Sequence, residues 1–348
     1  MEADEVPPRR GDLGWGALAG GRVVDVDEFA DSRPYFGLQR EAGYLWGVLR
    51  DENRRPLAFM RRLADPDVAP SEGAPHALGP QLILQTAWDD DVNLHLRKEA
   101  RRAASGDTLT RTLDGRHVVW RTADGDDLLV LGAESARWKE LGLIDVTGQR
   151  VGPGLHWYLP GRDDAIYYPT QTWEVTGEAL GRPVFGFLFY EEAYMPPGGR
   201  LYVRHDPLLG RQLHTTWFSW ATEWDDDSLE IGHFLFGHDR FAIAVIGDRD
   251  GNVRTTEHME CAVTRSADGY WADRIDYVLD GEAWEMVPEP WGRMVDLGRP
   301  PNPQQLGIVQ RVGEKRRPIN WMAWGESVPT HGDRRAVRSR LIASAGPR

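Results

Sequence analysis

Cysteine is almost absent from this chain. Cys261 is the single cysteine among 348 residues, so no intramolecular disulfide can form, and we expect a reducing compartment, the cytoplasm. Long apolar runs are missing as well. None approaches the roughly 20 residues of a membrane-spanning helix, and residues 1–12 contain no apolar stretch typical of a signal peptide. The sequence therefore predicts a cytoplasmic protein without a membrane span.

Positive charge is in deficit. The chain has 41 lysines and arginines against 54 aspartates and glutamates, which gives a net charge of −13. Nucleic-acid binding requires clustered basic side chains, and the basic clusters at 97–102 and 314–318 are short and accompanied by acids. We therefore expect no nucleic-acid partner.

Sequence signatures of cofactor sites are also missing. No P-loop and no G-x-S-x-G motif occurs, and the glycines of 14–21 depart from the G-x-G-x-x-G spacing of dinucleotide sites. The aspartates at 225–227 lack the ligand spacing of a calcium loop and predict an acidic turn. We expect neither a nicotinamide nor a flavin, and no other cofactor.

Short apolar or alternating segments, by contrast, are abundant, and they are typical of β-strands. They lie at 43–50, 81–88, 116–122, 127–133, 170–177, 183–189, 213–220, 229–236, 241–247 and 254–264. Asp-Gly pairs, which accept the positive φ angles of tight hairpin turns, occur at 114–115, 124–125, 250–251, 268–269 and 280–281. Because the βαβ alternation of a parallel sheet is missing, the sequence predicts an all-β protein with antiparallel connections.

The length favours two domains. A segment rich in Gly, Pro and Asp, 144–164, precedes a second series of strands that begins near Ile166. We therefore predict two packed antiparallel β-barrels or sandwiches, formed by residues 20–165 and 166–330. A tail or helix at 331–348 follows them.

A few segments predict something other than a strand. Helices are expected at 134–142 and 333–345, and a long loop at 292–307. The stretch 92–104 is ambiguous between helix and strand.

Two adjacent carboxylates interrupt an aromatic strand in 184-VFGFLFYEEAYMPPG-198. On a strand, Glu191 continues the face of Phe187 and Phe189, whereas Glu192 shares the opposite face with Tyr194. Burial beside aromatic rings raises the pKa of a carboxyl group, which suits a general acid. The alternative is that the strand simply reaches the surface at this point.

Histidines offer further polar candidates. On a strand, the side chain of His214 would share a face with Phe218 and Trp220, in an aromatic setting. His233 and His238 would face opposite ways on one strand, unless Gly237 turns the chain between them, and no cluster of metal-ligating residues accompanies them. We therefore expect no metal site.

Two sections of the second half form a distinctive series: 167-YYPTQTWEVTGEALGRPVFGFLFYEEAYM-195, and the section from Trp217 to Val253, where a W-F-S strand, an acidic turn, a hydrophobic strand and D-x-D-G follow in order. In these sections the chain resembles the carotenoid 1,2-hydratase (hydroxyneurosporene synthase) family. The resemblance covers about 100 residues. The first half is similar only in outline, through Tyr44, Trp46 and 57–63. The wider superfamily has two lipocalin-like β-barrels and includes phytoalexin hydratases and lipocalin-like pericyclases.

This resemblance implies acid-assisted chemistry on an apolar, unsaturated small molecule without a redox cofactor. Glu191 stands where the family has an Asp, and Tyr194 stands where it has a Trp. The family's Glu before that Trp is Ala193 here, and Glu192 takes the intervening place. The acid has therefore shifted, or hydration has given way to isomerisation or cyclisation.

These observations together predict a hydratase, isomerase or cyclase that acts on a terpenoid, a polyene or a similar molecule. Glu191 would donate the proton, with Glu192, Tyr194 and His214 as relay or water-positioning groups. Aromatic side chains would line the substrate site and stabilise positive charge: Phe187, Phe189, Trp173, Trp217, Trp220 and Tyr168. The alternatives are a non-catalytic carrier of a hydrophobic ligand and a metal-dependent enzyme with His233, His238 and His258 as ligands. Monomer and homodimer both remain open.

Overall fold

The structure is a computed structural model. It describes residues 18–23, 25–31, 33–63, 82–88, 94–97, 109–140, 142–161, 163–201, 205–208, 214–237, 241–294 and 303–327. The predicted helix at 333–345, the tail at 331–348 and His238 lie outside these residues. Among them, the single helix, α1 (Val26–Ala30), has five residues, so none is long enough to cross a membrane.

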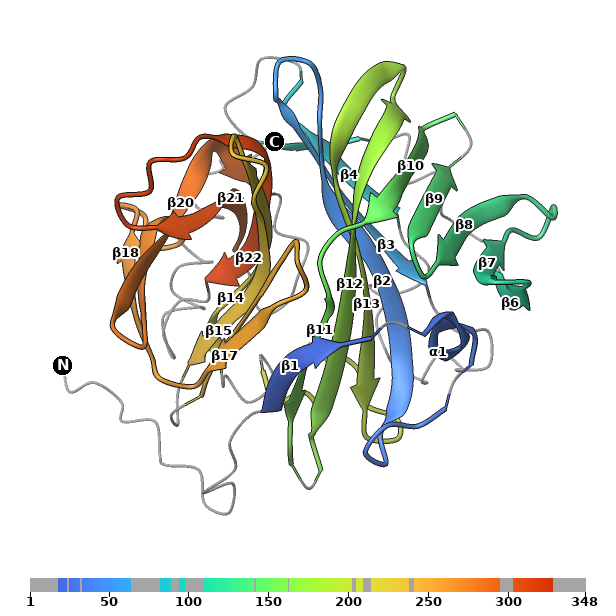
Figure 1. The fold of residues 1–348 in the computed structure, drawn as a ribbon, viewed down its shortest axis with the longest axis horizontal. Coiled ribbons are helices and arrows are strands. Elements are labelled where there is room, and N and C mark those ends of the chain that lie inside the picture. The colour runs from blue at the N-terminus through green and yellow to red at the C-terminus, as the bar shows by residue number, and fades with distance from the viewer. Residues whose placement is uncertain are drawn as a thin grey trace, which may run out of the picture.

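The described residues form two antiparallel sheets, which confirms the all-β prediction (Figure 1). The first sheet has 13 strands in the order β5-β4-β3-β2-β13-β12-β10-β9-β8-β7-β6, with β11 pairing β12 and β1 pairing β11. It forms a half-barrel. Its strands are β1 (Leu18–Arg22), β2 (Gln39–Arg50), β3 (Pro56–Leu63), β4 (Leu82–Thr86), β5 (His95–Leu96), β6 (Thr110–Asp114), β7 (His117–Arg121), β8 (Asp127–Gly132), β9 (Ser135–Glu140), β10 (Ile144–Arg150), β11 (Gly154–Leu159), β12 (Ile166–Ala179) and β13 (Arg182–Met195).

The second sheet has nine strands in the order β17-β16-β15-β14-β22-β21-β20-β19-β18. It curls into a nearly closed barrel beside the long strands of the first sheet (Figure 1). Its strands are β14 (His214–Trp224), β15 (Leu229–Gly237), β16 (Ala242–Asp248), β17 (Val253–Thr256), β18 (Met259–Arg265), β19 (Ala272–Leu279), β20 (Glu282–Arg293), β21 (Gln304–Arg311) and β22 (Pro318–Ser327).

The chain passes from one sheet to the other later than the predicted boundary at residue 165. Strands β12 and β13 follow that boundary, yet β12 pairs with β10 and β13 pairs with β2 of the first sheet. The change of sheet therefore falls between Met195 and His214. The reason is that β2 and β13 pair over their lengths, although far apart in sequence, and strand segments alone do not reveal such pairing.

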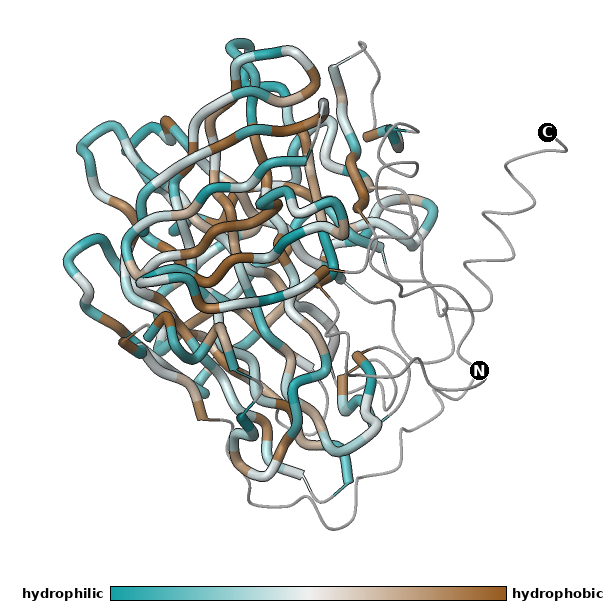
Figure 2. Tube along the Cα trace, turned by 90° about the vertical axis from the view of Figure 1, so that its right-hand side faces the viewer, coloured by the Kyte–Doolittle hydropathy of each residue, from teal (hydrophilic) through white to brown (hydrophobic). Residues whose placement is uncertain are grey.

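All five Asp-Gly pairs lie in hairpin connections, as predicted. They join β6 to β7, β7 to β8, β16 to β17, β18 to β19 and β19 to β20. Each of the five glycines has a positive φ, between 63° and 89°, which side chains with a Cβ atom rarely adopt. Hydrophilic residues accordingly mark the turns and apolar residues run along the strands (Figure 2).

The prediction of a helix at 134–142 is wrong, because these residues contain strand β9. Burial alternates residue by residue along β9. Trp138 points into a core with no exposed surface, and Glu140 forms an ion pair with Arg61 at 3.0 Å. Pairing with β8 and β10 on either side outweighs the helical propensity of the segment. Of the ambiguous stretch 92–104, the described part contains the short strand β5.

Glycines let strands β2 and β13 of the first sheet lie against each other. A Cβ atom at Gly186 of β13 would come within 2.1 Å of the Val48 carbonyl oxygen, and one at Gly47 of β2 within 2.1 Å of the Phe187 carbonyl oxygen. The φ angles are 158° and 159°. Because no side chain fits at either position, glycine permits the strands to coil where the half-barrel curves.

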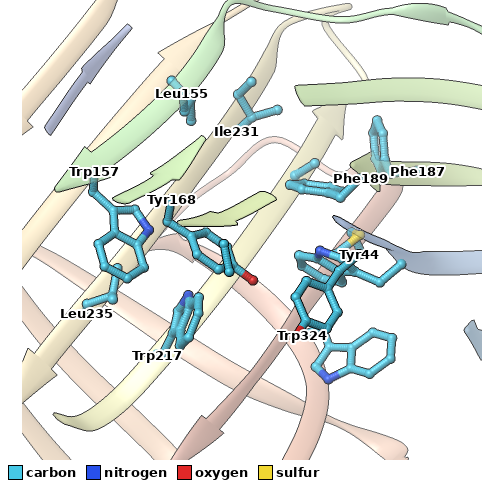
Figure 3. Close-up of a cluster of buried hydrophobic side chains, with 14 of the residues drawn as sticks. Tyr44, Leu155, Trp157, Tyr168, Phe187, Phe189, Trp217, Ile231, Leu235 and Trp324 are labelled. Carbon is cyan, nitrogen blue, oxygen red and sulfur yellow. The ribbon is translucent and has the colours of Figure 1, made fainter. Parts of the chain in front are cut away.

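One apolar core, here called the shared core, contains residues from both sheets. The first sheet contributes Trp46, Tyr168 and Phe189, and the second contributes Trp217 and Trp324. The Trp46 and Trp324 rings meet edge to face at 5.4 Å. Two further cores lie elsewhere, one within the first sheet and one within the second. The two sheets are therefore joined by a buried aromatic layer (Figure 3).

A buried ion pair also links the sheets. The guanidinium of Arg50 on β2 pairs with Glu289 of β20, donates to the Trp321 carbonyl oxygen at 3.0 Å and lies 3.9 Å above the Trp321 ring. Arg50 has no exposed surface. This contact ties β2 of the first sheet to β20 and β22 of the second.

Candidate functional site

The predicted register of the Glu-Glu pair agrees with the structure. Glu191 lies on β13 between Tyr44 of β2 and Thr170 of β12. Its neighbours on the same face, Phe187 and Phe189, belong to the shared core. With 3% of its surface exposed, Glu191 is a core residue rather than the surfacing end of a strand.

The carboxyl group of Glu191 contacts hydroxyl groups rather than cations. The Tyr168 hydroxyl donates to Oε2 at 2.8 Å, and the Thr170 hydroxyl lies 3.4 Å from Oε1. No ion pair of Glu191 is found within the described residues. Burial raises the pKa of Glu191 to about 8, a rise that the Tyr168, Trp46 and Thr170 side chains oppose. The Trp46 indole N–H lowers this pKa although it forms no hydrogen bond of good geometry within the described residues.

Aromatic rings surround this carboxyl group. Tyr168 stacks on Trp157 with ring centroids 5.1 Å apart, and Trp217 of the second sheet meets Tyr168 edge to face at 5.1 Å. On the other side, Trp46 packs on Phe189 at 4.8 Å. Figure 3 shows the Tyr168 hydroxyl pointing from the Trp157 and Trp217 side toward the side of Tyr44 and Phe189. A proton at Glu191 therefore faces an environment rich in π electrons.

Glu192 has the opposite environment. It ion-pairs with Arg40 through Oε1 at 3.0 Å, and it accepts hydrogen bonds of 2.7 Å from both Tyr190 and Tyr194. Arg40 in turn donates to the Tyr190 hydroxyl at 3.0 Å. Glu192 therefore links β13 to Arg40 at the start of β2 through one ion pair and two tyrosine hydrogen bonds.

A second carboxylate near the shared core is paired in the same way. Glu41 accepts from Arg62 at 2.6 Å and from the Tyr44 hydroxyl at 2.8 Å. The two carboxylates beside Tyr44 thus differ: Glu41 pairs with an arginine, whereas the partners of Glu191 among the described residues are hydroxyl groups.

The structure brings some of the predicted site residues together and separates others. Phe187, Phe189, Tyr168 and Trp217 lie with Glu191 in the shared core. Trp173 belongs to the core of the first sheet and Trp220 to that of the second, whereas Tyr194 packs in a small cluster with Tyr35 and Tyr167. His214 lies at the start of β14, and its side chain is not among the described parts.

Sequence reasoning missed several residues of this layer. Trp46, Trp157 and Trp324 join it from strands β2, β11 and β22. A polar pair, Ser219 and His233, lies on the second sheet with Ser219 Oγ 2.7 Å from His233 Nδ1. Their position among apolar residues on alternating strands was a usable signal, but their pairing depends on the register of β14 and β15.

Surface hollows lie away from Glu191. One of about 540 Å³ is lined by Asp51, Asn53, Arg55, Trp88, Arg182 and Trp291. Another of about 430 Å³ lies over β7 to β10 and β12. The candidate site is therefore defined by its buried polar groups and not by either hollow.

The proposed histidine ligands of a metal do not come together in the part of the chain that the structure describes. His233 is fully buried on β15, His258 is exposed in the turn before β18, and His238 is not described. Across the described residues, no three His, Cys, Asp or Glu side chains are grouped as metal ligands.

Comparison with known proteins yields structural likeness. No protein-family model matches the chain, and no curated protein matches its sequence. Similar solved structures include an AttH-type protein of Nitrosomonas europaea (16% identity, TM-score 0.47, covering 85% of this chain and 94% of that one). CghA with Sch210972 is also similar (12% identity, TM-score 0.42, covering 83% of this chain and 89% of that one). So is kievitone hydratase from Nectria haematococca (9% identity, TM-score 0.45, covering 88% of this chain and 94% of that one). At these identities and TM-scores the likenesses assign neither a family nor a reaction to this chain.

Proposed function

We propose that this protein is a cofactor-independent enzyme that protonates an apolar, unsaturated small molecule held between the two sheets. Glu191 is the acid. The observation that carries the proposal is a fully buried carboxyl group among aromatic rings, held by hydroxyl groups and without an ion-pair partner among the described residues. The sequence resemblance to carotenoid hydratases supports the same chemistry.

The protonation state of Glu191 suits this role. With a pKa of about 8, the carboxyl group is mostly protonated at neutral pH and is available as a general acid. When it gives its proton to an alkene carbon, the π bond supplies the electron pair for the new C–H bond. A carbocation and a carboxylate result.

Side chains of the shared core can stabilise both charges. The π faces of Trp46, Trp217 and Phe189 favour a cation in a site from which water is excluded. The Tyr168 hydroxyl, which donates to Oε2 at 2.8 Å, stabilises the carboxylate that forms. Tyr168 therefore acts on the acid, whereas the indole rings act on the substrate.

Three outcomes of the carbocation are chemically balanced. Water can add and then return a proton to Glu191, which is hydration. A neighbouring C–H bond can release its proton instead, which is isomerisation. A second double bond can attack and the product then lose a proton, which is cyclisation. In each case the Glu191 carboxyl group regains its proton, so no redox partner is required.

Deuterium transfer tests the proposal directly. The protein is incubated in D₂O with a panel of isoprenoid polyenes and prenyl alcohols, and mass spectrometry measures deuterium bound to carbon together with any added water. We expect turnover of at least one compound. Glu191→Gln, which keeps the shape but has no acidic proton, should lower the rate by a factor on the order of 10²–10⁴.

Glu178→Gln is the matched control: it makes the same substitution at an exposed position of β12, and it should keep full activity. Compounds that bind without any deuterium incorporation would favour the non-catalytic carrier instead. Full activity in Glu191→Gln would remove Glu191 from the reaction.

A further inference from the structure

Ser219 and His233 form a buried polar pair on the second sheet. They stand opposite each other on β14 and β15, with Ser219 Oγ 2.7 Å from His233 Nδ1. Their exposed surfaces are 2% and 0%. The neighbours of His233 on the same face of β15, Ile231 and Leu235, belong to the shared core, so this pair lies on the face that the second sheet turns toward the first.

The hydrogen bond selects one tautomer of His233. If the Ser219 hydroxyl donates to Nδ1, that nitrogen is the acceptor of the neutral ring, so the ring proton lies on Nε2. If Nδ1–H donates instead, the hydroxyl proton of Ser219 needs another acceptor, and the described residues supply none by hydrogen-bond geometry. The first arrangement satisfies more groups, so Nε2 carries a hydrogen.

That N–H group is left over. Nε2 is buried and has no hydrogen-bond partner among the described residues, and burial of a polar group without a partner is unfavourable. Burial also lowers the pKa of His233 to about 3, so the ring is neutral at physiological pH. A neutral donor, rather than a cation, is thus offered to the apolar layer.

We propose that His233 Nε2–H donates a hydrogen bond to a carbonyl or hydroxyl oxygen of the bound small molecule, with Ser219 as the positioning residue that fixes the tautomer. This inference rests on the proposed function, since the molecule is the one that Glu191 protonates, and it narrows the substrate class. The substrate is an oxygenated unsaturated compound and not a pure hydrocarbon. Glu191 and His233 then contact it from opposite sheets.

Two probes that differ by one oxygen atom distinguish hydrogen-bond donation by His233 from a contribution of its ring to packing. β-Ionone, a conjugated ketone, and its deoxygenated hydrocarbon analogue are titrated by equilibrium dialysis against the wild-type protein and variants. His233→Phe, which keeps an apolar ring and removes the donor, should weaken β-ionone binding on the order of 10-fold, as expected for one buried hydrogen bond. Binding of the hydrocarbon should stay within about twofold.

His233→Gln, which retains an N–H donor, should recover part of the β-ionone affinity. Ser219→Ala should lose less β-ionone affinity than His233→Phe. It removes the hydrogen bond that selects the tautomer of His233, but it leaves the imidazole donor in place. Equal losses for both probes, or no β-ionone binding by the wild-type protein up to the solubility limit, would overturn the proposal. If a buried water molecule is the only partner of Nε2, His233→Phe should likewise change the affinities for β-ionone and the hydrocarbon equally.

A second measurement uses only the wild-type protein, so it does not depend on the folding of any variant. In ¹⁵N-histidine NMR, His233 should show a protonated Nε2 and an unprotonated Nδ1, with no titration between about pH 5 and 8. The opposite tautomer would overturn the assignment of the donor. Failure of Glu191→Gln to reduce turnover would leave these binding and tautomer results unchanged, so the two proposals fail separately.

Discussion

Glu191 and Glu192 are adjacent in the chain and point to opposite faces of β13. Glu192 ion-pairs with Arg40 at 3.0 Å, whereas Glu191 is held by the hydroxyl group of Tyr168 at 2.8 Å. Both are buried. Two neighbouring carboxyl groups on one strand therefore have different partners, an arginine for Glu192 and a tyrosine hydroxyl for Glu191.

Glu192→Gln should destabilise the protein. It removes the carboxylate that pairs with the buried guanidinium of Arg40, and breaking a buried ion pair by removing one partner costs about 3–5 kcal/mol. Urea unfolding, followed by tryptophan fluorescence, measures the loss. The Glu191→Gln variant is the control and should lose less than about 1 kcal/mol, because Glu191 pairs with no cation in the described part of the chain. Equal losses in both variants would contradict the distinction between the two carboxylates.

The activity should depend on the protonated form of Glu191. Because the pKa is raised to about 8, the rate should be constant near neutrality and fall as the pH rises through about 8. In Tyr168→Phe the hydrogen bond that favours the carboxylate is gone, so the fall should move upward by about one unit or more. A pH–rate profile of both proteins measures the shift. A downward movement would mean that Tyr168 stabilises the neutral acid.

The same carboxyl group should make stability fall with pH. Its pKa is higher in the folded protein than the ordinary value near 4.5, so between these values the folded state holds a proton that the unfolded state has released. Stability is therefore greatest below the lower value and is lost as the pH rises toward about 8.

Unfolding free energies at about pH 5 and pH 7.5 test this sign. Between these two pH values, the free energy of unfolding of the wild type should fall by up to roughly 3 kcal/mol more than that of Glu191→Gln. This follows from about 1.4 kcal/mol per pH unit for one proton. An identical pH dependence in the two proteins would place the folded pKa of Glu191 near its ordinary value.

Gly186→Ala should destabilise the contact between β2 and β13. The new methyl group would meet the Val48 carbonyl oxygen at 2.1 Å, so the strands must separate, and we expect a loss of at least about 2 kcal/mol from strain and lost pairing. Thermal unfolding measures it. Gly115→Ala is the comparison: its φ is also positive, at 63°, but no atom lies within 4 Å of the new Cβ, so it should cost only the roughly 1 kcal/mol of conformational strain.

Local patterns predicted local features well. The Asp-Gly turns were found because their chemistry is contained in two residues, and the opposite faces of Glu191 and Glu192 followed from strand geometry. The failure at β9 has the same origin, since residues 134–142 have local helical character that only neighbouring strands override.

Features that depend on distant pairing could not be predicted. Alternation shows that Trp173, Trp217 and Trp220 are buried, but not that they occupy three different cores. Likewise, Ser219 and His233 meet only because β14 and β15 pair in one particular register. The sheet to which β13 belongs was hidden for the same reason: its partner β2 begins about 140 residues earlier.

The order of strands in the second sheet has a consequence during protein synthesis. Strand β14 pairs with β15 and with β22, the last described strand, which ends at Ser327. Trp217 and Trp324 cannot both cover the aromatic face of the first sheet until that strand has left the ribosome. From the synthesis of Met195, which ends β13, until that of Ser327, the nascent chain therefore presents Trp46, Tyr168 and Phe189 without their full cover. Binding by a chaperone in this interval would protect the chain from aggregation.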